Sequence, residues 1–486
     1  MLRTLRIALA VFCFAGCNLL FLDVSGLLPQ EFALLAKMQL VPALLSGSFL
    51  IAAALVACTL LFGRVYCSTL CPLGVLQDVF ARLGRKERFR FSRGRPWLRA
   101  GALLAFLLAF LTGASLLFSI LEPYSSFGRI AANLLAPVWQ TGSNILALAS
   151  ERAGNFALGP TPVWQKGLSA LVVAAATFGV ISALAIRSGR TWCNTLCPVG
   201  AFLGFLHCFA LFRPRIEPEK CVHCGVCAQN CKASCIDAAN AAMDSSRCVA
   251  CFNCLGNCRS RAISYTPPQR AGRNSAREAV SPNLARRACI AAGVGVLGFP
   301  LNAAARNPDE RPPDLSRKKR PTREIPVTPP GSSGLRAFME HCTGCQLCVS
   351  ACPNQVLSAV DHGENMLRPA LSFERGFCRV NCVSCSVVCP TGAIQPITVE
   401  QKSAIQIGRA AVDRERCIVT TDKVQCTACS RTCPTGAAAL VGREGEPKLP
   451  AVNPERCIGC GACEYVCPVR PLSAIRVEGN LEHRRV

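Results

Sequence analysis

Residues 342–353 read CTGCQLCVSACP, with four cysteines separated by two, two and three residues and followed by a proline. The pattern recurs along the 486-residue chain, with the first gap widened in two of its six copies, and it accounts for 24 of the 34 cysteines. The six quartets span residues 221–231, 248–258, 342–352, 378–389, 417–433 and 457–467. Cysteines repeated at this spacing indicate [4Fe–4S] ligation, because soft thiolates at short intervals can surround one cube.

Two other uses of cysteine fit the pattern less well. A zinc ribbon has knuckles of two cysteines but no third cysteine at the same step, and secreted disulfide scaffolds are small and lack this periodicity. Four quartets end in Cys-Pro, as the bacterial ferredoxin motif does, whereas Cys231 and Cys258 are followed by Lys232 and Arg259. The spacing therefore predicts six [4Fe–4S] clusters in α+β bacterial-type ferredoxin domains that hold two clusters each.

The quartets are expected to interlace in pairs, because the first three thiolates of such a motif hold one cluster and the fourth holds its partner. The predicted ligand sets are Cys221, Cys224, Cys227 and Cys258; Cys248, Cys251, Cys254 and Cys231; Cys342, Cys345, Cys348 and Cys389; Cys378, Cys382, Cys385 and Cys352; Cys417, Cys426, Cys429 and Cys467; and Cys457, Cys460, Cys463 and Cys433. Other cysteines lie in apolar stretches and are expected to act as small hydrophobes. They are Cys13, Cys17, Cys58, Cys208 and Cys289. The sequence indicates no role for Cys235.

The composition places part of the chain in lipid and argues against nucleic-acid binding. Hydrophobic residues make up 51% and charged residues 17%, with a mean hydropathy of +0.32, which excludes a disordered chain. An oxidised all-thiolate cluster carries about −2, so six clusters lower the formal charge of +24 to roughly +12. The basic run 317–320 has no interleaved aromatic residues, and it is interpreted as a solvated tether.

Four uncharged apolar stretches predict an α-helical membrane bundle of four spans. The stretches are Ile7 to Leu22, Met38 to Gly63, Ala100 to Leu121 and Gly167 to Ile186. Eight basic residues in 64–95, against one in 23–37 and three in 122–166, place 64–95 and the N terminus in the cytoplasm. Residues 130–150 are uncharged but carry polar interruptions, and we interpret them as an outer-face amphipathic or re-entrant piece.

An internal repeat follows spans two and four. The stretch GRVYCSTLCPLG at 63–74 matches GRTWCNTLCPVG at 189–200, with the same orientation in the membrane. If each turn is helical, Cys67 and Cys71 share one face, as do Cys193 and Cys197. The four thiols are then expected to converge at the inner membrane face. Redox-active dithiols, a further metal site and packing by small helix-end residues all remain open as roles for them.

A second targeting signal is predicted inside the chain. Arg286 and Arg287 precede an uncharged stretch, 288–305, that is rich in glycine and alanine and ends in small residues. This is typical of a twin-arginine export signal, although a short buried helix or a fifth span fits the same residues. Because that route exports folded cofactor proteins, the last four clusters are expected in the periplasm. The proline-rich linker after it would hold them off the membrane.

These features resemble a fusion of two known proteins. Residues 1 to about 265 resemble the NapH-type membrane component of a quinol dehydrogenase, with four spans, two Cys-x3-Cys-Pro motifs and two quartets. Residues from about 280 resemble an exported ferredoxin of the NapG/MauM type. The fusion itself, the missing prolines and an arginine motif without Phe-Leu-Lys depart from the family pattern.

The predicted domains follow from these boundaries. They are a four-span membrane domain (1–212), a cytoplasmic two-cluster ferredoxin domain (213–265), a twin-arginine-type signal or fifth span (284–305), a proline-rich linker (306–334) and an exported four-cluster ferredoxin domain (335–486).

The resemblance implies a component of a quinol dehydrogenase in the bacterial inner membrane. It would oxidise membrane quinol and pass electrons through the clusters to a periplasmic cytochrome or reductase, such as nitrate reductase. Quinol also loses protons, so an ionisable group is expected near the outer face. The candidates are Glu122, Tyr124, Asp23 and Glu31, with helix capping as the alternative role for each.

Two other classes stay possible on the sequence. A membrane metal-reducing assembly factor of the CcoG type would share the spans, the Cys-x3-Cys-Pro motifs and two quartets, but would lack the four exported quartets. A NosR-type regulatory or maturation electron donor would carry a flavin-binding outer domain.

Overall fold

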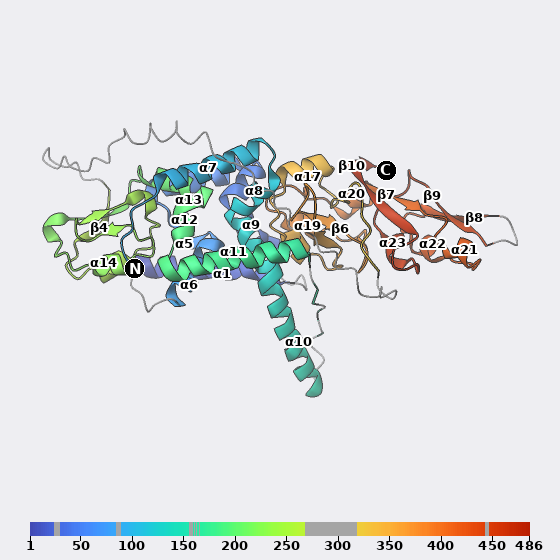
Figure 1. Cartoon of the computed structure of the whole chain (residues 1–486), viewed down its shortest axis with the longest axis horizontal. Coiled ribbons are helices and arrows are strands. Elements are labelled where there is room, and N and C mark those ends of the chain that lie inside the picture. The colour runs from blue at the N-terminus through green and yellow to red at the C-terminus, as the bar shows by residue number, and fades with distance from the viewer. Residues whose placement is uncertain are drawn as a thin grey trace, which may run out of the picture.

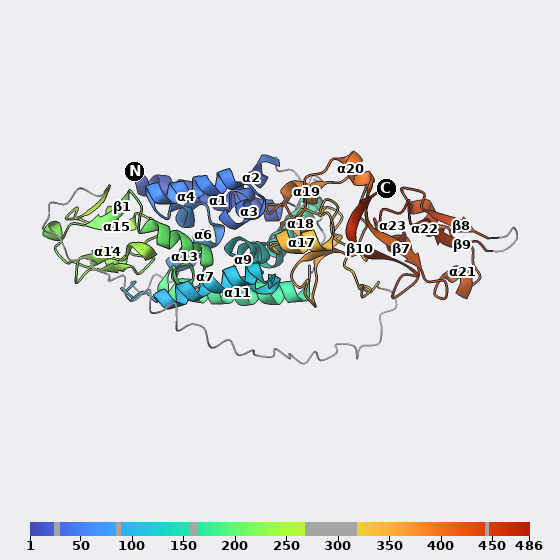
Figure 2. The same ribbon diagram turned by 90° about the horizontal axis from the view of Figure 1, so that it is seen from above.

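The computed structural model describes residues 1–23, 30–83, 89–154, 159, 161, 163–164, 166–267, 318–442 and 447–486. A helical bundle occupies the middle of the molecule, and two smaller α+β parts lie at its opposite ends, as Figures 1 and 2 show from two directions. Residues 213–267 form one end and residues 318–486 the other. The predicted signal or fifth span at 284–305, and the first part of the linker, lie outside the described residues.

Two of the four predicted spans are single long helices. Helices α1 (Leu2–Leu22) and α11 (Leu168–Ser188) have 21 residues each, and their length and composition are sufficient to cross a membrane. Each runs along the long axis of the molecule (Figure 1).

The other two predicted spans are each divided into two shorter helices, so the described residues contain two helices, not four, that are long and apolar enough to cross a membrane. Residues 38–63 divide into α3 (Leu40–Leu45) and α4 (Phe49–Phe62), and Gly47 lies between them with a φ of +72°. Residues 96–121 divide into α7 (Pro96–Leu111) and α8 (Ser115–Leu121) around Gly113, with a φ of +70°. Left-handed backbone ends a helix, and glycine adopts it at little cost.

The two copies of the sequence repeat fold alike. Each begins with a five-residue helix, α5 (Val65–Thr69) or α12 (Thr191–Thr195), and continues through Cys-Pro into a longer helix, α6 (Pro72–Leu83) or α13 (Pro198–His207). Proline suits the first position of a helix because its fixed φ is already helical and it has no N–H to satisfy there.

A long helical stretch begins after residue 122, and its last part leaves the bundle. It comprises α9 (Pro123–Ile130), a π-helical turn (Ala131–Leu135) and α10 (Ala136–Arg152). In Figure 1, α10 points away from the rest of the chain, and Val138, Trp139, Ile145 and Leu146 are exposed along it. This placement favours the amphipathic interpretation of residues 130–150 over the re-entrant one.

Both ends have the short strands and loops of small ferredoxin units. At the first end, β1 (Arg213–Ile216) pairs antiparallel with β4 (Ile263–Thr266) and β2 (Ile236–Asp237) with β3 (Ala242–Met243), beside α14 (Val226–Gln229) and α15 (Asn253–Asn257). At the other end, β5 (Leu357–Ala359) pairs with β6 (Pro369–Leu371), β7 (Ile405–Val412) with β10 (Ile475–Arg485), and β8 (Ala438–Val441) with β9 (Leu449–Val452). The helices there are α17 (Leu335–His341), α18 (Leu347–Ser350), α19 (Ser384–Val388), α20 (Val399–Ser403), α21 (Ile418–Thr421), α22 (Ala428–Thr432) and α23 (Ala462–Val466).

Candidate iron-sulfur centres

Three cavities in the C-terminal part are lined by cysteines in the groups that interlaced quartets predict. Each has a volume of about 20 Å³. The cysteines around them are Cys417, Cys426, Cys429 and Cys467 in the first; Cys433, Cys457, Cys460 and Cys463 in the second; and Cys352, Cys378, Cys382 and Cys385 in the third. In each case the fourth cysteine of one quartet joins the first three cysteines of its partner.

The remaining C-terminal set lies at the boundary with the bundle. Burial raises the pKa of the Cys348 thiol, and the neighbouring thiols of Cys345, Cys342 and Cys389 raise it further. Four thiols this close disfavour each other's ionisation, and a bound metal removes that penalty because it holds the thiolate form.

The first end of the molecule contains the two other sets. Cys231, Cys248, Cys251 and Cys254 are buried together in one core, and Cys227 and Cys258 pack against its edge. The pKa of Cys254 is raised by burial and then by the thiols of Cys251, Cys248 and Cys231. The other set is more open to solvent, since Cys224 is exposed.

These residues fit [4Fe–4S] clusters. The thiols surround a space rather than a point, and no group of three or more Cys, His, Asp or Glu side chains in the described ranges is arranged to hold a single metal ion. Soft thiolate donors favour iron-sulfur ligation. A bound cluster supplies one-electron transfer at each such site.

The four C-terminal sites form a continuous row that begins at the bundle. The thiol of Cys385 helps to raise the pKa of the Cys348 thiol, and the thiol of Cys429 helps to raise that of Cys463. The backbone N–H of Cys378 donates a hydrogen bond to the carbonyl oxygen of Cys460 at 2.9 Å. Each of these contacts joins neighbouring ligand sets.

The loop that carries Cys345 is docked directly on the bundle. Ser119 Oγ donates to the carbonyl oxygen of Thr343 at 2.6 Å, and Asn133 Nδ2 donates to Gln346 Oε1 at 2.7 Å. Gly128 of α9 lies against the carbonyl of Cys345 so closely that a side chain there would overlap it. Cys345 therefore belongs to the same buried core as the bundle helices.

Two candidate quinol-site residues lie beside this loop. Glu122 is 1% exposed and caps α9 by accepting hydrogen bonds from the N–H groups of Tyr124 and Ser125. Burial raises the pKa of Glu122, although those hydrogen bonds oppose the shift. The hydroxyl of Tyr124 is buried and has no hydrogen-bond partner among the residues that the structure describes.

The two other candidates lie elsewhere. Asp23 ends α1, where its N–H donates to Leu19, and Glu31 is exposed in a 3-10 turn (Gln30–Phe32). Glu122 also caps a helix, which is the alternative role expected for these residues. Among the four candidates, Glu122 alone combines helix capping with burial next to a cysteine quartet.

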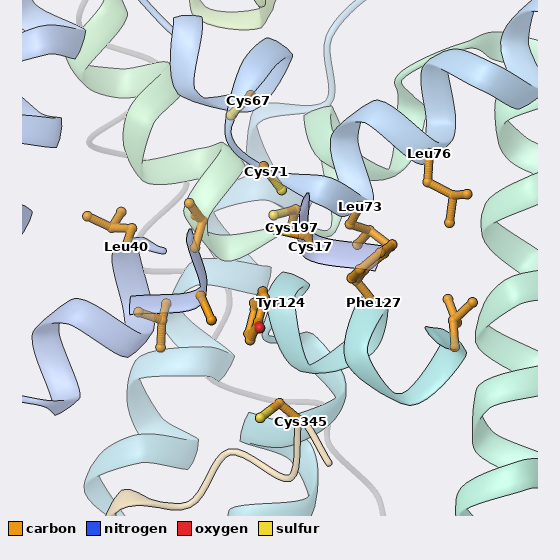
Figure 3. Close-up of a cluster of buried hydrophobic side chains, with 14 of the residues drawn as sticks. Cys17, Leu40, Cys67, Cys71, Leu73, Leu76, Tyr124, Phe127, Cys197 and Cys345 are labelled. Carbon is orange, nitrogen blue, oxygen red and sulfur yellow. The ribbon is translucent and has the colours of Figure 1, made fainter. Parts of the chain in front are cut away.

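The four cysteines of the repeat converge, and the repeat packs against the ferredoxin unit of residues 213–267. Cys67, Cys71 and Cys197 lie in the same core as Tyr124 and Cys345 (Figure 3). They are carried by α5 and α12, the short helices that follow α4 and α11, and by the Cys-Pro that comes after each short helix.

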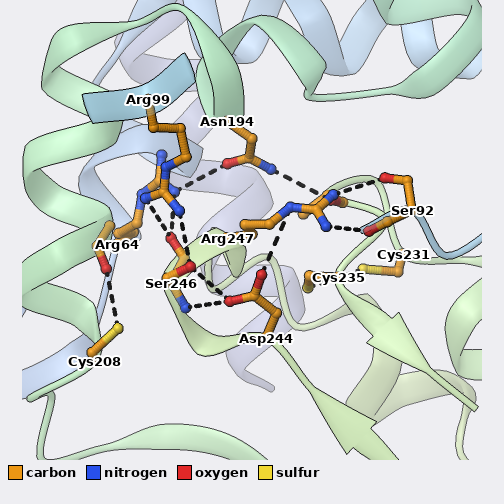
Figure 4. A network of polar contacts seen from close by, with 12 residues as sticks. Arg64, Ser92, Arg99, Asn194, Cys208, Cys231, Cys235, Asp244, Ser246 and Arg247 are labelled. Carbon is orange, nitrogen blue, oxygen red and sulfur yellow. Dashed lines mark hydrogen bonds and ion pairs between the residues drawn. The ribbon is translucent and has the colours of Figure 1, made fainter. Parts of the chain in front are cut away.

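The ferredoxin unit formed by residues 213–267, called the inner ferredoxin unit after its predicted side of the membrane, is held on the repeat by a polar network (Figure 4). Arg64 Nη1 donates to Asn194 Oδ1 at 3.1 Å and to the carbonyl oxygen of Ser246 at 3.3 Å. Asn194 Nδ2 donates to the carbonyl oxygen of Ala233 at 3.4 Å, and Arg247 Nη2 donates to Ser92 Oγ at 3.0 Å. The network fixes the loops that carry Cys231 and Cys248 against the bundle.

Cys235 is a residue of this site that the sequence did not identify. Its Sγ lies 3.5 Å from Cys231 Sγ, and it also contacts the thiol of Cys248. It reaches them because the turn after Cys231 folds back into the core, which the cysteine spacing alone does not reveal. The innermost ligand set therefore has a fifth thiol next to it.

Substitution of Cys235 by serine is expected to leave the iron content unchanged and to alter the EPR signal of one inner cluster. A thiol beside two ligand sulfurs donates to them, and hydrogen bonds to the sulfurs tune a cluster's potential. Iron assays and a redox titration check this on the full chain, with Cys208→Ser as the control. Loss of about four irons would instead make Cys235 a ligand.

Comparisons with known proteins agree with these assignments. A family described as a 4Fe-4S binding domain matches residues 46–90 and 170–217, and a 4Fe-4S dicluster domain family matches residues 341–393 and 423–470. The first family therefore covers the two Cys-x3-Cys-Pro repeats and none of the quartets. No solved structure matches the chain.

Three relatives cover different parts of the chain. The putative electron transport protein YccM of Escherichia coli is 26% identical over 43% of this chain, and the match spans 52% of YccM. The methylamine utilization ferredoxin-type protein MauM of Methylophilus methylotrophus is 33% identical over 32% of this chain and 73% of its own length. The ferredoxin-type protein NapF of Escherichia coli is 29% identical over 30% of this chain and 84% of its own length. The chain therefore belongs to the ferredoxin-type electron-transport proteins that carry 4Fe-4S domains.

Proposed function

We propose that this chain is a membrane-anchored electron-transfer protein that oxidises quinol at the outer end of its bundle and passes electrons toward a periplasmic cytochrome or reductase. The observation that carries the proposal is the docking of the Cys345 loop on α9, from which three further cysteine sets continue outward. A row of electron carriers that begins at the membrane and ends in a water-exposed domain can accept electrons from a lipid-soluble donor and deliver them to a soluble acceptor.

The same proposal includes the finer features that the sequence suggests. These are six [4Fe–4S] clusters, four spans in the inner membrane, an inner and an outer ferredoxin part, and the likeness to a fusion of NapH-type and NapG-type proteins. The positions of the two ferredoxin parts at opposite ends of the bundle support this topology (Figure 2). A metal-reducing assembly factor of the CcoG type has no use for the four outer quartets.

Glu122 and Tyr124 are the residues proposed to receive quinol. Oxidation of one quinol releases two electrons and two protons, and a buried carboxylate with a raised pKa accepts a proton more readily than an exposed one. The unpartnered hydroxyl of Tyr124 is available to donate a hydrogen bond to a quinone oxygen. Both groups lie next to Cys345, so the proton and the electron leave the substrate at neighbouring places.

The test is anaerobic addition of menaquinol or ubiquinol analogues to the purified full chain. Quinol is expected to bleach the visible absorption of the clusters within the time taken to mix the solutions by hand. Glu122→Gln is expected to slow the rate of bleaching about 100-fold. Glu31→Gln, an exposed carboxylate outside the proposed site, serves as the matched control. Clusters that stay oxidised under quinol while dithionite reduces them would refute quinol oxidation.

A further inference from the structure

Four of the buried thiols outside the six ligand sets belong to the Cys-x3-Cys-Pro repeats. Cys67, Cys71, Cys193 and Cys197 are each 4–5% exposed. Arg64 Nη2 points at Cys67 Sγ at 3.8 Å. These side chains come from the two copies of one repeat, 126 residues apart in the chain.

A second polar group is also aimed at these thiols. Gln77 Nε2 donates to Cys193 Sγ at 3.1 Å. A buried amide hydrogen bond to a sulfur atom is best used when that sulfur carries negative charge, as a metal-bound thiolate does.

Positive charge exceeds negative charge around the thiols. Arg64 is fully buried, and no carboxylate pairs with it in the part of the chain that the structure describes. Asp78 serves three cations, since it pairs with Arg190 at 2.8 Å, Lys232 at 3.1 Å and Arg6 at 3.4 Å. A buried cation without a counter-charge is costly. Thiolates at the repeat would supply the missing negative charge.

The two copies hold each other in a fixed geometry. Arg64 Nη2 donates to the carbonyl oxygen of Cys193 at 3.4 Å, and Arg190 Nη1 donates to the carbonyl oxygen of Cys67. Gly74 and Gly200 follow the Cys-Pro of their repeats, and a side chain at either would overlap the carbonyl of the first cysteine in its own repeat. The thiols are thus carried by a rigid, two-fold arrangement, which suits a preformed metal site.

The thiols lie between the inner and outer ligand sets. On the inner side, Arg190 N–H donates to the carbonyl oxygen of Lys232 at 2.8 Å, next to Cys231. On the outer side, Tyr124 separates Cys71 and Cys197 from Cys345 (Figure 3). Without a centre here, the bundle would divide the cysteine sets into two unconnected groups.

We propose that Cys67, Cys71, Cys193 and Cys197 together ligate a seventh centre, an iron-sulfur cluster that joins the inner and outer sets inside the bundle. Two guanidinium groups frame the four thiols, and thiols that served only as small packing residues would not require them. The match of a 4Fe-4S binding family to both repeats agrees with this ligand chemistry. The use of the centre as a connection rests on the proposed function, whereas its existence does not.

Iron and acid-labile sulfide assays on the anaerobically purified full chain test the site. About 28 irons per chain are expected, and the fourfold variant Cys67→Ser, Cys71→Ser, Cys193→Ser, Cys197→Ser is expected to retain about 24. The matched control is Cys13→Ser with Cys17→Ser, two buried cysteines of α1 outside the repeat, which should keep about 28. A wild-type chain with about 24 irons and four free or disulfide-linked repeat thiols would overturn the proposal.

A second variant keeps the test decisive if the fourfold variant does not fold. Cys71→Ser alone is expected to retain a cluster with one oxygen ligand and to change one EPR signal while the other signals persist. An EPR spectrum identical to that of the wild type would also overturn the proposal. If the seventh centre is absent but quinol still bleaches the other clusters, only this inference fails and the proposed function stands.

Discussion

Gly128→Val is expected to separate the outer clusters from the bundle and to slow their reduction by quinol about 100-fold, because misplacement of reacting groups by about 1 Å has effects of this size. A side chain at residue 128 would overlap the carbonyl of Cys345 and approach Phe21 Cζ to 3.0 Å. Neither α9 nor the cluster loop has room to retreat, since Ser119 and Asn133 bind the same loop.

The measurement is the rate at which quinol analogues bleach the clusters, together with the iron content. Gly142→Val is the matched control, because Gly142 lies in α10 and a side chain there meets nothing within 4 Å. Iron content should be unchanged in both variants. Equal bleaching rates in both would mean that electrons do not enter through the Cys345 loop.

Asp78→Asn is expected to lower the free energy of unfolding by about 3–5 kcal/mol, the usual cost of removing one partner from a buried charge cluster. Asp78 is the shared partner of Arg6, Arg190 and Lys232, which join α1, the repeat and the inner ferredoxin unit. Without its charge, three cations would remain close together in a buried site. Thermal unfolding in detergent measures the loss.

Glu217→Gln is the control for Asp78→Asn. Glu217 pairs with Lys220 at 2.6 Å, but both side chains are exposed, and exposed pairs contribute little. A melting temperature as low as that of Asp78→Asn would show that the loss does not depend on burial of the pair.

The Asp78 cluster also predicts how stability responds to acid. Burial alone would raise the pKa of Asp78, but the charges of Arg190, Lys232 and Arg6 hold it well below its usual range. A carboxyl with a lowered folded-state pKa stabilises the fold at pH values above its unfolded pKa of about 3.9, and the contribution is lost as pH falls further. The contribution of Asp78 to the stability of the wild type should therefore be fully present, and should not change with pH, between pH 5 and 8.

The cysteine spacing predicts which cysteines group together in the C-terminal part, and three of these groups line cavities in the structure. Ligation of a cluster depends on short-range spacing, so the spacing alone is enough to group Cys352 with Cys378, and both cysteines line the same cavity. The capping role of Glu122 is also among the alternatives that the sequence offers. These features are local, and local features are what a sequence pattern expresses.

Other features could not be predicted because they depend on distant contacts. The approach of Cys235 to Cys231 requires the fold of a turn, and the docking of Gly128 on Cys345 joins residues 217 positions apart with no periodic pattern. A prediction based on apolar composition misses the helix breaks at Gly47 and Gly113, because it does not take the conformational freedom of glycine into account.

The crossed contacts of Arg64 and Arg190 carry one more consequence. An interface in which one copy's arginine reaches the other copy's cysteine, and the reverse, has the symmetry of a homodimer about a two-fold axis. The two repeats of one chain therefore meet as two identical subunits would, and the cysteine loop of each copy is held by the arginine of the other.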